Sequence, residues 1–153
     1  MRSATAVDAT TIIEPHQWNP TNAIVTARTQ IVVGGTNGIG MLTARWLAQH
    51  DGTRALVLAS RSGVLGHDSA GEHERLHSGN VPSLVHKCDV AEKSHVAQLM
   101  ASVAGVAPVR SLWHTAGVLA DSVLSGQNAK ALARVYAPKA TGSWTLECAC
   151  HTV

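Results

Sequence analysis

Short apolar runs rich in β-branched residues alternate along this chain with longer segments of helical periodicity, and this alternation constrains the fold most strongly. Brief apolar runs bounded by glycine, proline or polar residues are typical of buried strands. The strands that we expect are residues 31–33, 55–59, 83–85 and 109–113. Continuous apolar strands separated by helices predict an α/β fold in which helices cover both faces of a parallel sheet.

The segments between the expected strands carry apolar residues at helical spacing. In the first segment, which ends near residue 51, these residues are Ile39, Leu42, Trp46 and Leu47. A later segment has one predicted apolar face, formed by Val96, Leu99, Met100 and Val103. The chain is again helical from residue 127 to about residue 150, with expected interruptions at Pro138 and Gly142.

Residues 1–28 show no sustained periodicity and contain Pro15 and Pro20, so we expect a linker or an irregular segment there. The remaining residues, 29–153, form the expected folded part. A chain of 153 residues can bury a core but is short for a complete dehydrogenase. Parallel sheets of this kind bind ligands at the carboxyl ends of their strands, which is where a site is expected.

Composition excludes several classes of function. The formal charge of +2 gives no basic stripe, so no nucleic-acid partner is expected. No apolar run approaches the roughly 20 residues of a membrane span, and the N-terminus lacks the apolar stretch of a secretory signal. Three widely spread cysteines suit a reducing compartment better than a disulfide framework. We therefore expect a cytoplasmic protein without a membrane partner.

A glycine-rich loop joins the first expected strand to the first helix. Its residues are Gly34, Gly35, Thr36, Asn37, Gly38, Ile39 and Gly40. Glycines let the backbone turn tightly and approach a pyrophosphate, and the helix N-terminus adds free N–H groups and a positive dipole end. The spacing is G-x-x-x-G-x-G, and no Gly-Lys-Ser/Thr follows as in a P-loop. The alternative is an ordinary glycine-rich turn, but the strand before and the helix after favour nucleotide binding.

Arg61 follows the second expected strand, 21 residues after Gly40. An acidic residue at this place would bind a ribose 2′-hydroxyl and select NAD, whereas the planar donors of an arginine suit the 2′-phosphate of NADP. The first acid after this strand is Asp68. The sequence therefore predicts NADPH as the cofactor. The alternative is a solvated arginine just beyond a strand.

Five stretches together resemble the ketoreductase domain of modular polyketide synthases, a member of the short-chain dehydrogenase/reductase superfamily. They are residues 34–40, 56–63, 88–90, 114–119 and 136–139. The resemblance covers about residues 29–150. It implies a Rossmann-type fold that is truncated after the fourth strand and the helix after that strand.

The resemblance implies a role for each matching residue. Those that would hold NADPH are Gly34, Gly38 and Gly40 at the pyrophosphate, Ser60 and Arg61 at the 2′-phosphate, Asp89 and Val90 at the adenine, and Ala116 and Gly117 at the nicotinamide ribose. An alternative role for Asp89 is that of a helix N-cap with Glu92 as its capping-box partner.

Lys139 matches the catalytic lysine of these ketoreductases; the alternative is a solvated helix lysine. Tyr136 precedes it by three residues, not by the four of the Tyr-x-x-x-Lys pair, so we expect Tyr136 to be a packed helix residue. The chain also departs from the family, which usually has Thr at the position of Val33 and an acid at the position of Ala120. The family's Ser and Tyr would lie beyond Val153.

The activity implied by the resemblance is the NADPH-dependent reduction of a β-ketoacyl thioester tethered to an acyl carrier protein. Because the Ser and Tyr are absent, we expect the chain alone to bind NADP(H) without turnover, and to self-associate or to need a completing chain. The alternative is a non-catalytic NADP-binding module or partner subunit.

Residues 73–77 spell His-Glu-Arg-Leu-His, which matches the H-E-x-x-H pattern of zinc peptidases. The surrounding segment, residues 66–80, is polar, and Leu76 is its large apolar residue. The positions where an extended motif would place a glycine and a third histidine hold Asn80 and Ser83. We therefore expect solvated helix residues and no bound metal, with a zinc peptidase as the remote alternative.

Overall fold

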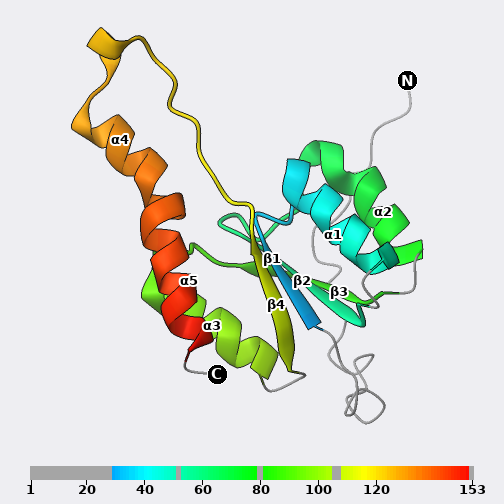
Figure 1. Cartoon of the computed structure of the whole chain (residues 1–153). Helices are drawn as coiled ribbons and strands as arrows, with labels where there is room; N and C mark the ends of the chain where they lie inside the picture. Colours follow the sequence, from blue (N-terminus) through cyan, green and yellow to red (C-terminus); the bar gives the residue numbers. More distant parts are fainter. Residues whose placement is uncertain (1–28, 51–52, 79–80, 105–107, 152–153) are drawn as a thin grey trace, which may run out of the picture.

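The computed structural model describes residues 29–50, 53–78, 81–104 and 108–151. Four parallel strands form one sheet in the order β3-β2-β1-β4 (Figure 1). The strands are β1 (Thr29–Val33), β2 (Ala55–Ser60), β3 (Ser83–Lys87) and β4 (Val109–His114). The predicted α/β class and the four strands are therefore confirmed. The expected linker at residues 1–28 lies outside the described residues.

The helices connect the strands in the predicted alternation. They are α1 (Gly38–His50), α2 (Ala70–Ser78), α3 (Lys93–Ala104), α4 (Ala129–Tyr136) and α5 (Gly142–Cys150). Two single turns are 3₁₀, η3 (His67–Ser69) and η4 (Leu124–Gly126), and one is π-helical, η5 (Ala137–Thr141). None of the helices in these ranges is long and apolar enough to cross a membrane.

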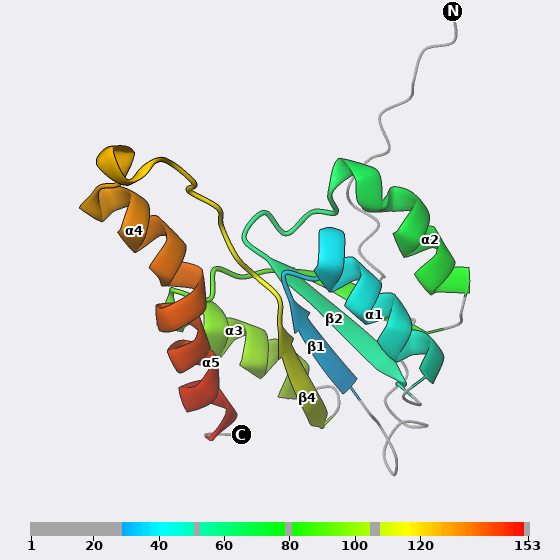
Figure 2. The same ribbon diagram turned by 45° about the horizontal axis from the view of Figure 1, so that its top comes forward.

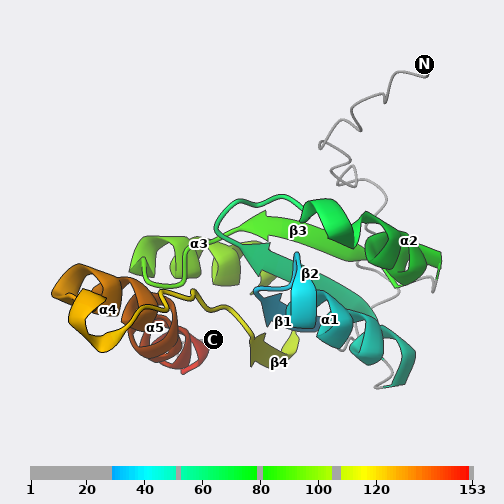
Figure 3. The same ribbon diagram turned by 90° about the horizontal axis from the view of Figure 1, so that it is seen from above.

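Two apolar clusters hold the helices against opposite faces of the sheet (Figures 2 and 3). One face packs against α3 and α5 through Ile31, Val57, Leu99 and Leu146. The other face packs against α1 and α2, where Leu76 is buried. All five residues of β1 are buried because this strand has a neighbour on each edge and a helix layer on each face.

The strand order fixes where a ligand can bind. From β1 the chain runs to β2 and β3 on one side, and then crosses to place β4 on the other side of β1. The loops after β1 and β4 therefore leave the sheet in opposite directions. In open α/β sheets this switch point is the preferred place for a ligand.

The apolar face of α1 is not the one that its larger side chains suggest. Met41, Ala44 and Leu47 are buried against the sheet, whereas Ile39 is 77% exposed and Trp46 is 51% exposed. Apolar residues thus occupy two sides of this helix, and helical spacing alone cannot tell which side meets the core. In α3, by contrast, all four predicted residues are buried.

The helical segment after β4 is interrupted as predicted, and the interruption is a π turn. Pro138 lies within η5, and the N–H of Gly142 donates to the carbonyls of Ala137 and Lys139. The expectation that Tyr136 packs against the fold is wrong. Tyr136 ends α4, which projects beyond the sheet, and its side chain is 63% exposed (Figure 1).

The H-E-x-x-H residues lie on α2, where His73 and His77 pack edge to face with 4.4 Å between ring centroids. Both Nε2 atoms are 3.4 Å from the Ser83 hydroxyl oxygen. His73 is half-buried, so the expectation of a fully solvated segment is only partly met. Burial, and secondarily the neighbouring His77, lower the pKa of His73. Within the described ranges, no group of three or more His, Cys, Asp or Glu side chains could hold a metal ion.

Candidate cofactor site

The glycine loop begins where β1 ends and is joined to both neighbouring strands. Gly34 donates its N–H to the carbonyl of Ala59 at 2.7 Å, which links the loop to β2. The N–H and hydroxyl of Thr115 both donate to the carbonyl of Val33, at 2.8 and 2.7 Å, which links the loop after β4 to β1. These bonds fix the carboxyl ends of β1, β2 and β4 relative to one another.

Close backbone contacts explain three of the glycines. Gly34 has φ +82°, and a Cβ there would lie 2.7 Å from the nitrogen of Ala116. A Cβ on Gly40 would lie 2.1 Å from the carbonyl oxygen of Gly34, so α1 can start this close to the strand only with glycine. Gly35 is also crowded, with the carbonyl of Val32 2.6 Å from the position of a Cβ.

Gly38 has a different environment from the other loop glycines. Its φ is +49°, and apart from its chain neighbours and the backbone of its own helix no atom lies within 4 Å of the position of a Cβ. The first turn of α1 contains no acidic residue. The open space over Gly38, at the positive end of a 13-residue helix, suits an anion such as a pyrophosphate, although the N–H of Gly38 itself donates to the Asn37 side chain. The residues present therefore fit the predicted phosphate group.

The segment after β2 folds back onto the glycine loop through Asn37. The side-chain oxygen of Asn37 accepts hydrogen bonds from the N–H of Gly38 at 2.8 Å and from the hydroxyl of Ser69 at 3.0 Å. Gly66 donates its N–H to the carbonyl of Thr36 at 2.9 Å. The Thr36 side chain is buried within this part of the loop.

Ser60 and Arg61 lie at the carboxyl end of β2, beside this loop. The Ser60 hydroxyl accepts the N–H of Gly63 at 3.2 Å and closes a tight turn in which Gly63 has φ +68°. Arg61 is exposed on this turn, and none of the ion pairs within the described residues involves it. A guanidinium without a carboxylate partner keeps its donors available for a phosphate.

Asp89 does not cap α3, so the capping-box alternative is wrong. Its carboxylate accepts the N–H of Ala91 at 3.1 Å, and its carbonyl accepts the N–H of Glu92 at 3.0 Å. These bonds form a turn before the helix, which begins only at Lys93. The side chain of Val90 is buried and contacts α5, since its Cγ2 lies 2.5 Å from the position of a Cβ on Gly142.

The end of β4 meets η5, and this contact brings Lys139 to the predicted nicotinamide end. The Cε and Nζ atoms of Lys139 both lie 3.2 Å from the position that a Cβ on Gly117 would occupy. The adjacent His114 ring lies with Nε2 2.8 Å from the carbonyl oxygen of Pro138. Ala116 is half-buried and packs against the cluster on the α3 side of the sheet.

Two of these contacts were not predicted from the sequence. His114 lay within a matching stretch but had no assigned role, and Asn37 was expected only to contact the cofactor. The signal for His114 was a histidine ring placed directly after the expected strand at residues 109–113. No sequence pattern indicated that Ser69 would reach Asn37, because the contact joins residues 32 positions apart.

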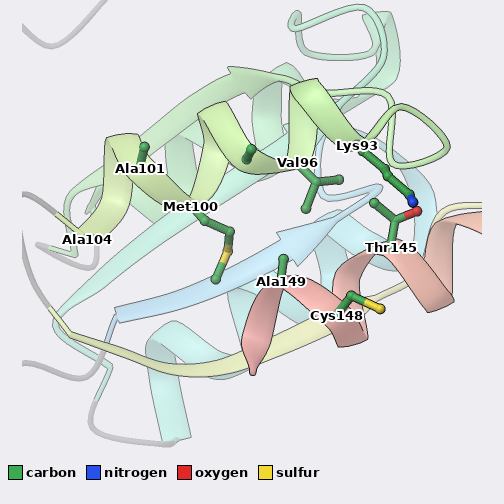
Figure 4. Close-up of a pocket in the computed structure, with 9 residues that line it drawn as sticks. Lys93, Val96, Met100, Ala101, Ala104, Thr145, Cys148 and Ala149 are labelled. Atoms are coloured by element: carbon green, nitrogen blue, oxygen red, sulfur yellow. The ribbon is translucent and has the colours of Figure 1, made fainter. Parts of the chain in front are cut away.

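A separate pocket of about 420 Å³ lies between α3 and α5 (Figure 4). Its walls are mainly apolar, with Met100 and Val96 on one side and Ala149 on the other, and Lys93 and Cys148 are polar groups in its lining. None of the predicted cofactor residues lines it. The predicted cofactor residues instead lie outside this pocket, mostly at the carboxyl ends of the strands.

The fold and the loops at its switch point define a Rossmann-type α/β protein. A profile of the KR domain family matches residues 28–152. The chain belongs to the KR domain family.

Several relatives of this chain are named as polyketide synthases. It is 35% identical over 133 residues to the spectinabilin polyketide synthase system protein NorB of Streptomyces orinoci, covering 86% of this chain and 6% of that protein. It is 34% identical over 119 residues to the phenolphthiocerol synthesis polyketide synthase type I Pks15/1 of Mycobacterium marinum, covering 77% of this chain and 5% of that protein. The chain thus spans a small part of the relatives that it matches.

Solved structures of ketoreductases share this architecture. An A-type ketoreductase from a modular polyketide synthase superposes with a TM-score of 0.75 at 30% identity, covering 83% of this chain and 27% of that one. A ketoreductase from the first module of phoslactomycin biosynthesis in a Streptomyces species superposes with a TM-score of 0.74 at 27% identity, covering 80% of this chain and 29% of that one. The predicted Rossmann-type fold and the predicted family are both confirmed.

Proposed function

We propose that residues 29–153 form the NADPH-binding portion of a ketoreductase domain, preceded by a linker at residues 1–28. The observation that carries the proposal is the close approach of the Lys139 side chain to Gly117. Gly117 follows β4, and the glycine loop follows the neighbouring strand β1. The residues predicted to bind the different parts of one dinucleotide are far apart in the sequence. They nevertheless follow neighbouring parallel strands of one sheet. Membership of the KR domain family supports the same function.

Each part of the cofactor would find a complementary group along the carboxyl ends of the strands. The open backbone at Gly38 would receive the pyrophosphate, and Arg61 would pair with the 2′-phosphate. The turn at Asp89 would contact the adenine, with the Val90 side chain packed beneath it against α5. Gly117, with the Lys139 side chain over it, would lie beside the nicotinamide ribose. NADPH is therefore favoured over NADH.

The reaction that we propose for the intact synthase is the reduction of a β-ketoacyl thioester held by an acyl carrier protein. NADPH, when bound, would supply the hydride. Lys139 would donate hydrogen bonds through its ammonium group to the ribose hydroxyls and so fix the nicotinamide end. The identity of the relatives as polyketide synthases supports this substrate class.

We further propose that the 153-residue chain binds NADPH without turning it over, since the family's Ser and Tyr have no counterparts in it. We also propose a cytoplasmic location, as expected from the sequence. Mixing the chain with NADPH and a β-ketoacyl thioester should leave the absorbance at 340 nm unchanged. Steady oxidation of NADPH would show that a residue of this chain serves as the proton donor.

The cofactor assignment is tested by titrating the chain with NADPH and NADH and following the quenching of tryptophan fluorescence. Replacing Arg61 by Ala should remove most of the preference for NADPH, since a charge-assisted bond to the 2′-phosphate is worth about 1.5–3 kcal/mol. Arg54→Ala is the matched control, because Arg54 is exposed and precedes the opposite end of the same strand. Equal affinity for both cofactors, or a preference that survives Arg61→Ala, would overturn the assignment.

A further inference from the structure

The π turn before α5 leaves one backbone carbonyl without its helical donor. In an α-helix the N–H of Gly142 would donate to the carbonyl of Pro138, four residues earlier. Here it donates to Ala137, five residues earlier, and to Lys139, three residues earlier. The carbonyl of Pro138 is thereby released from the helical ladder, one residue before the predicted catalytic lysine.

His114 supplies the donor that the carbonyl of Pro138 lacks. Its Nε2 lies 2.8 Å from the carbonyl oxygen of Pro138, and because a carbonyl can only accept, Nε2 must carry the hydrogen. The other ring nitrogen, Nδ1, is buried and has no hydrogen-bond partner within the described residues. The bond from Nε2 to Pro138 is therefore the one hydrogen bond of this ring within the described residues.

The two ends of this bond belong to rigid parts of the molecule. His114 is the last residue of β4, and the next residue, Thr115, is bound through its N–H and hydroxyl to the carbonyl of Val33 in the centre of the sheet. Pro138 is buried and restricted in φ by its ring. The hydrogen bond therefore ties the start of η5 to the sheet, and Lys139 comes directly after it, over Gly117.

We propose that His114 is a positioning residue: by donating from Nε2 to the carbonyl that the π turn releases, it holds Lys139 over the nicotinamide-ribose position. A π turn inserts one residue into a helix and rotates the next residues of the helix by about 100°. Without an anchor, the helical segment could return to regular α-helical bonding and turn Lys139 away from Gly117. This inference rests on the proposed function of Lys139.

The test compares two replacements of similar size in the full chain. His114→Gln keeps an N–H donor near the position of Nε2, whereas His114→Leu keeps the volume but removes the donor. With His114→Leu, NADPH affinity should fall about 2- to 10-fold, which corresponds to the loss of one hydrogen bond. With His114→Gln most of the affinity should return. His67→Gln, on an exposed side chain remote from η5, is the control and should have no effect.

A double-mutant cycle separates positioning from general damage. If His114 acts through Lys139, then Lys139→Met should weaken NADPH binding, and adding His114→Leu to it should cause little further loss. The preference for NADPH over NADH should stay unchanged in both His114 variants, since it is set at Arg61. Additive losses, or equal losses in the Gln and Leu variants, would overturn the proposal.

Two measurements keep this inference separate from the proposed function. Long-range ¹H–¹⁵N NMR spectra of the unaltered chain report the tautomer of His114, and a hydrogen on Nδ1 instead of Nε2 would overturn the proposal without any variant. Reductive ¹³C-methylation of the lysines gives each side chain an NMR signal without any cofactor. The Lys139 signal should shift in His114→Leu and be restored in His114→Gln, with the Lys130 signal unchanged. If no variant binds NADPH, the proposed function fails, and these two measurements still decide the role of His114.

Discussion

At the scale of single residues, the glycines of the first loop differ in what they tolerate. Gly40 is required by packing, because the carbonyl of Gly34 occupies the space of a Cβ. Gly38 is open and left-handed, so it is required by conformation and exposed to a ligand. The motif predicted the loop but not this division, because the division depends on how the carbonyl of Gly34 and the hydroxyl of Thr115, which follows β4, pack against Gly40.

Replacing Gly40 by Ala should therefore abolish NADPH binding and lower the free energy of unfolding, because the loop or α1 must move to relieve the contact with Gly34. Isothermal titration and urea unfolding measure the two effects. Gly71→Ala is the control, since a Cβ at this α2 position meets nothing within 4 Å and should stabilise the helix by about 0.5–1 kcal/mol. Normal binding by Gly40→Ala would contradict the loop geometry.

His73 gives a pH dependence of known sign. Burial, and then His77, lower its pKa in the folded chain, so the unfolded chain takes up this proton more readily. The stability present above the unfolded pKa of about 6.5 should thus decline as the pH falls toward the folded pKa. Urea unfolding between pH 7.5 and 5 should show a smaller decline in His73→Gln, and an unchanged one in His67→Gln. An equal decline in the unaltered chain and His73→Gln would show that burial of His73 does not affect stability.

At the scale of elements, the sequence predicted strands better than helix faces. All four expected strands are present, and β1 and β2 were the easiest to predict because a strand buried on both faces is a continuous apolar run, as in residues 55–59. The face of α1 was not predictable, because Trp46 and Met41 are both apolar and only the packed sheet distinguishes them. Trp46 instead lies edge to face with Trp113 of β4, with 6.4 Å between ring centroids. The alternative role of Asp89 as a helix cap also failed, because Asp89 accepts the N–H of Ala91 in a turn that precedes the helix, which begins at Lys93.

The contact between α5 and the loop after β3 depends on Gly142. A Cβ there would lie 2.5 Å from the Cγ2 of Val90, a methyl group on a stiff side chain. Gly142→Ala should therefore destabilise the chain by about 1–3 kcal/mol, as for an overpacked core. Thermal unfolding measures the effect, and Ser143→Ala, on the exposed neighbouring residue, should be nearly neutral. If both variants unfold at the same temperature, α5 does not pack on Val90 this closely.

At the scale of the whole molecule, the outer edge of β4 has no strand partner within the described residues, and exposed tryptophans lie on and near this strand and on α5. β4 pairs with β1, and no other strand of the described residues covers its second edge. Trp113 on this strand, with Trp46 beside it and Trp144 on α5, is substantially exposed. Unpaired strand edges and exposed aromatic surface favour association with another chain.

We therefore expect the 153-residue chain to self-associate in a concentration-dependent way, as the sequence suggested. Sedimentation velocity over a hundredfold range of concentration measures this. Trp113→Lys, which places a charge on the open edge, should shift the equilibrium toward monomer, and Leu124→Lys, on the exposed η4 turn, is the control. A monomer at all concentrations would show that the open edge is protected.

In the proposed arrangement NADPH lies across the carboxyl ends of β1, β2 and β4, and amide NMR shifts test this placement most directly. Titrating NADP⁺ into ¹⁵N-labelled chain should shift the amide signals of Gly38, Gly40, Arg61 and Gly117, while those of Ala101 and Cys148 in the pocket between α3 and α5 stay in place. Shifts confined to that pocket, or no saturable shifts at all, would contradict the proposed cofactor site.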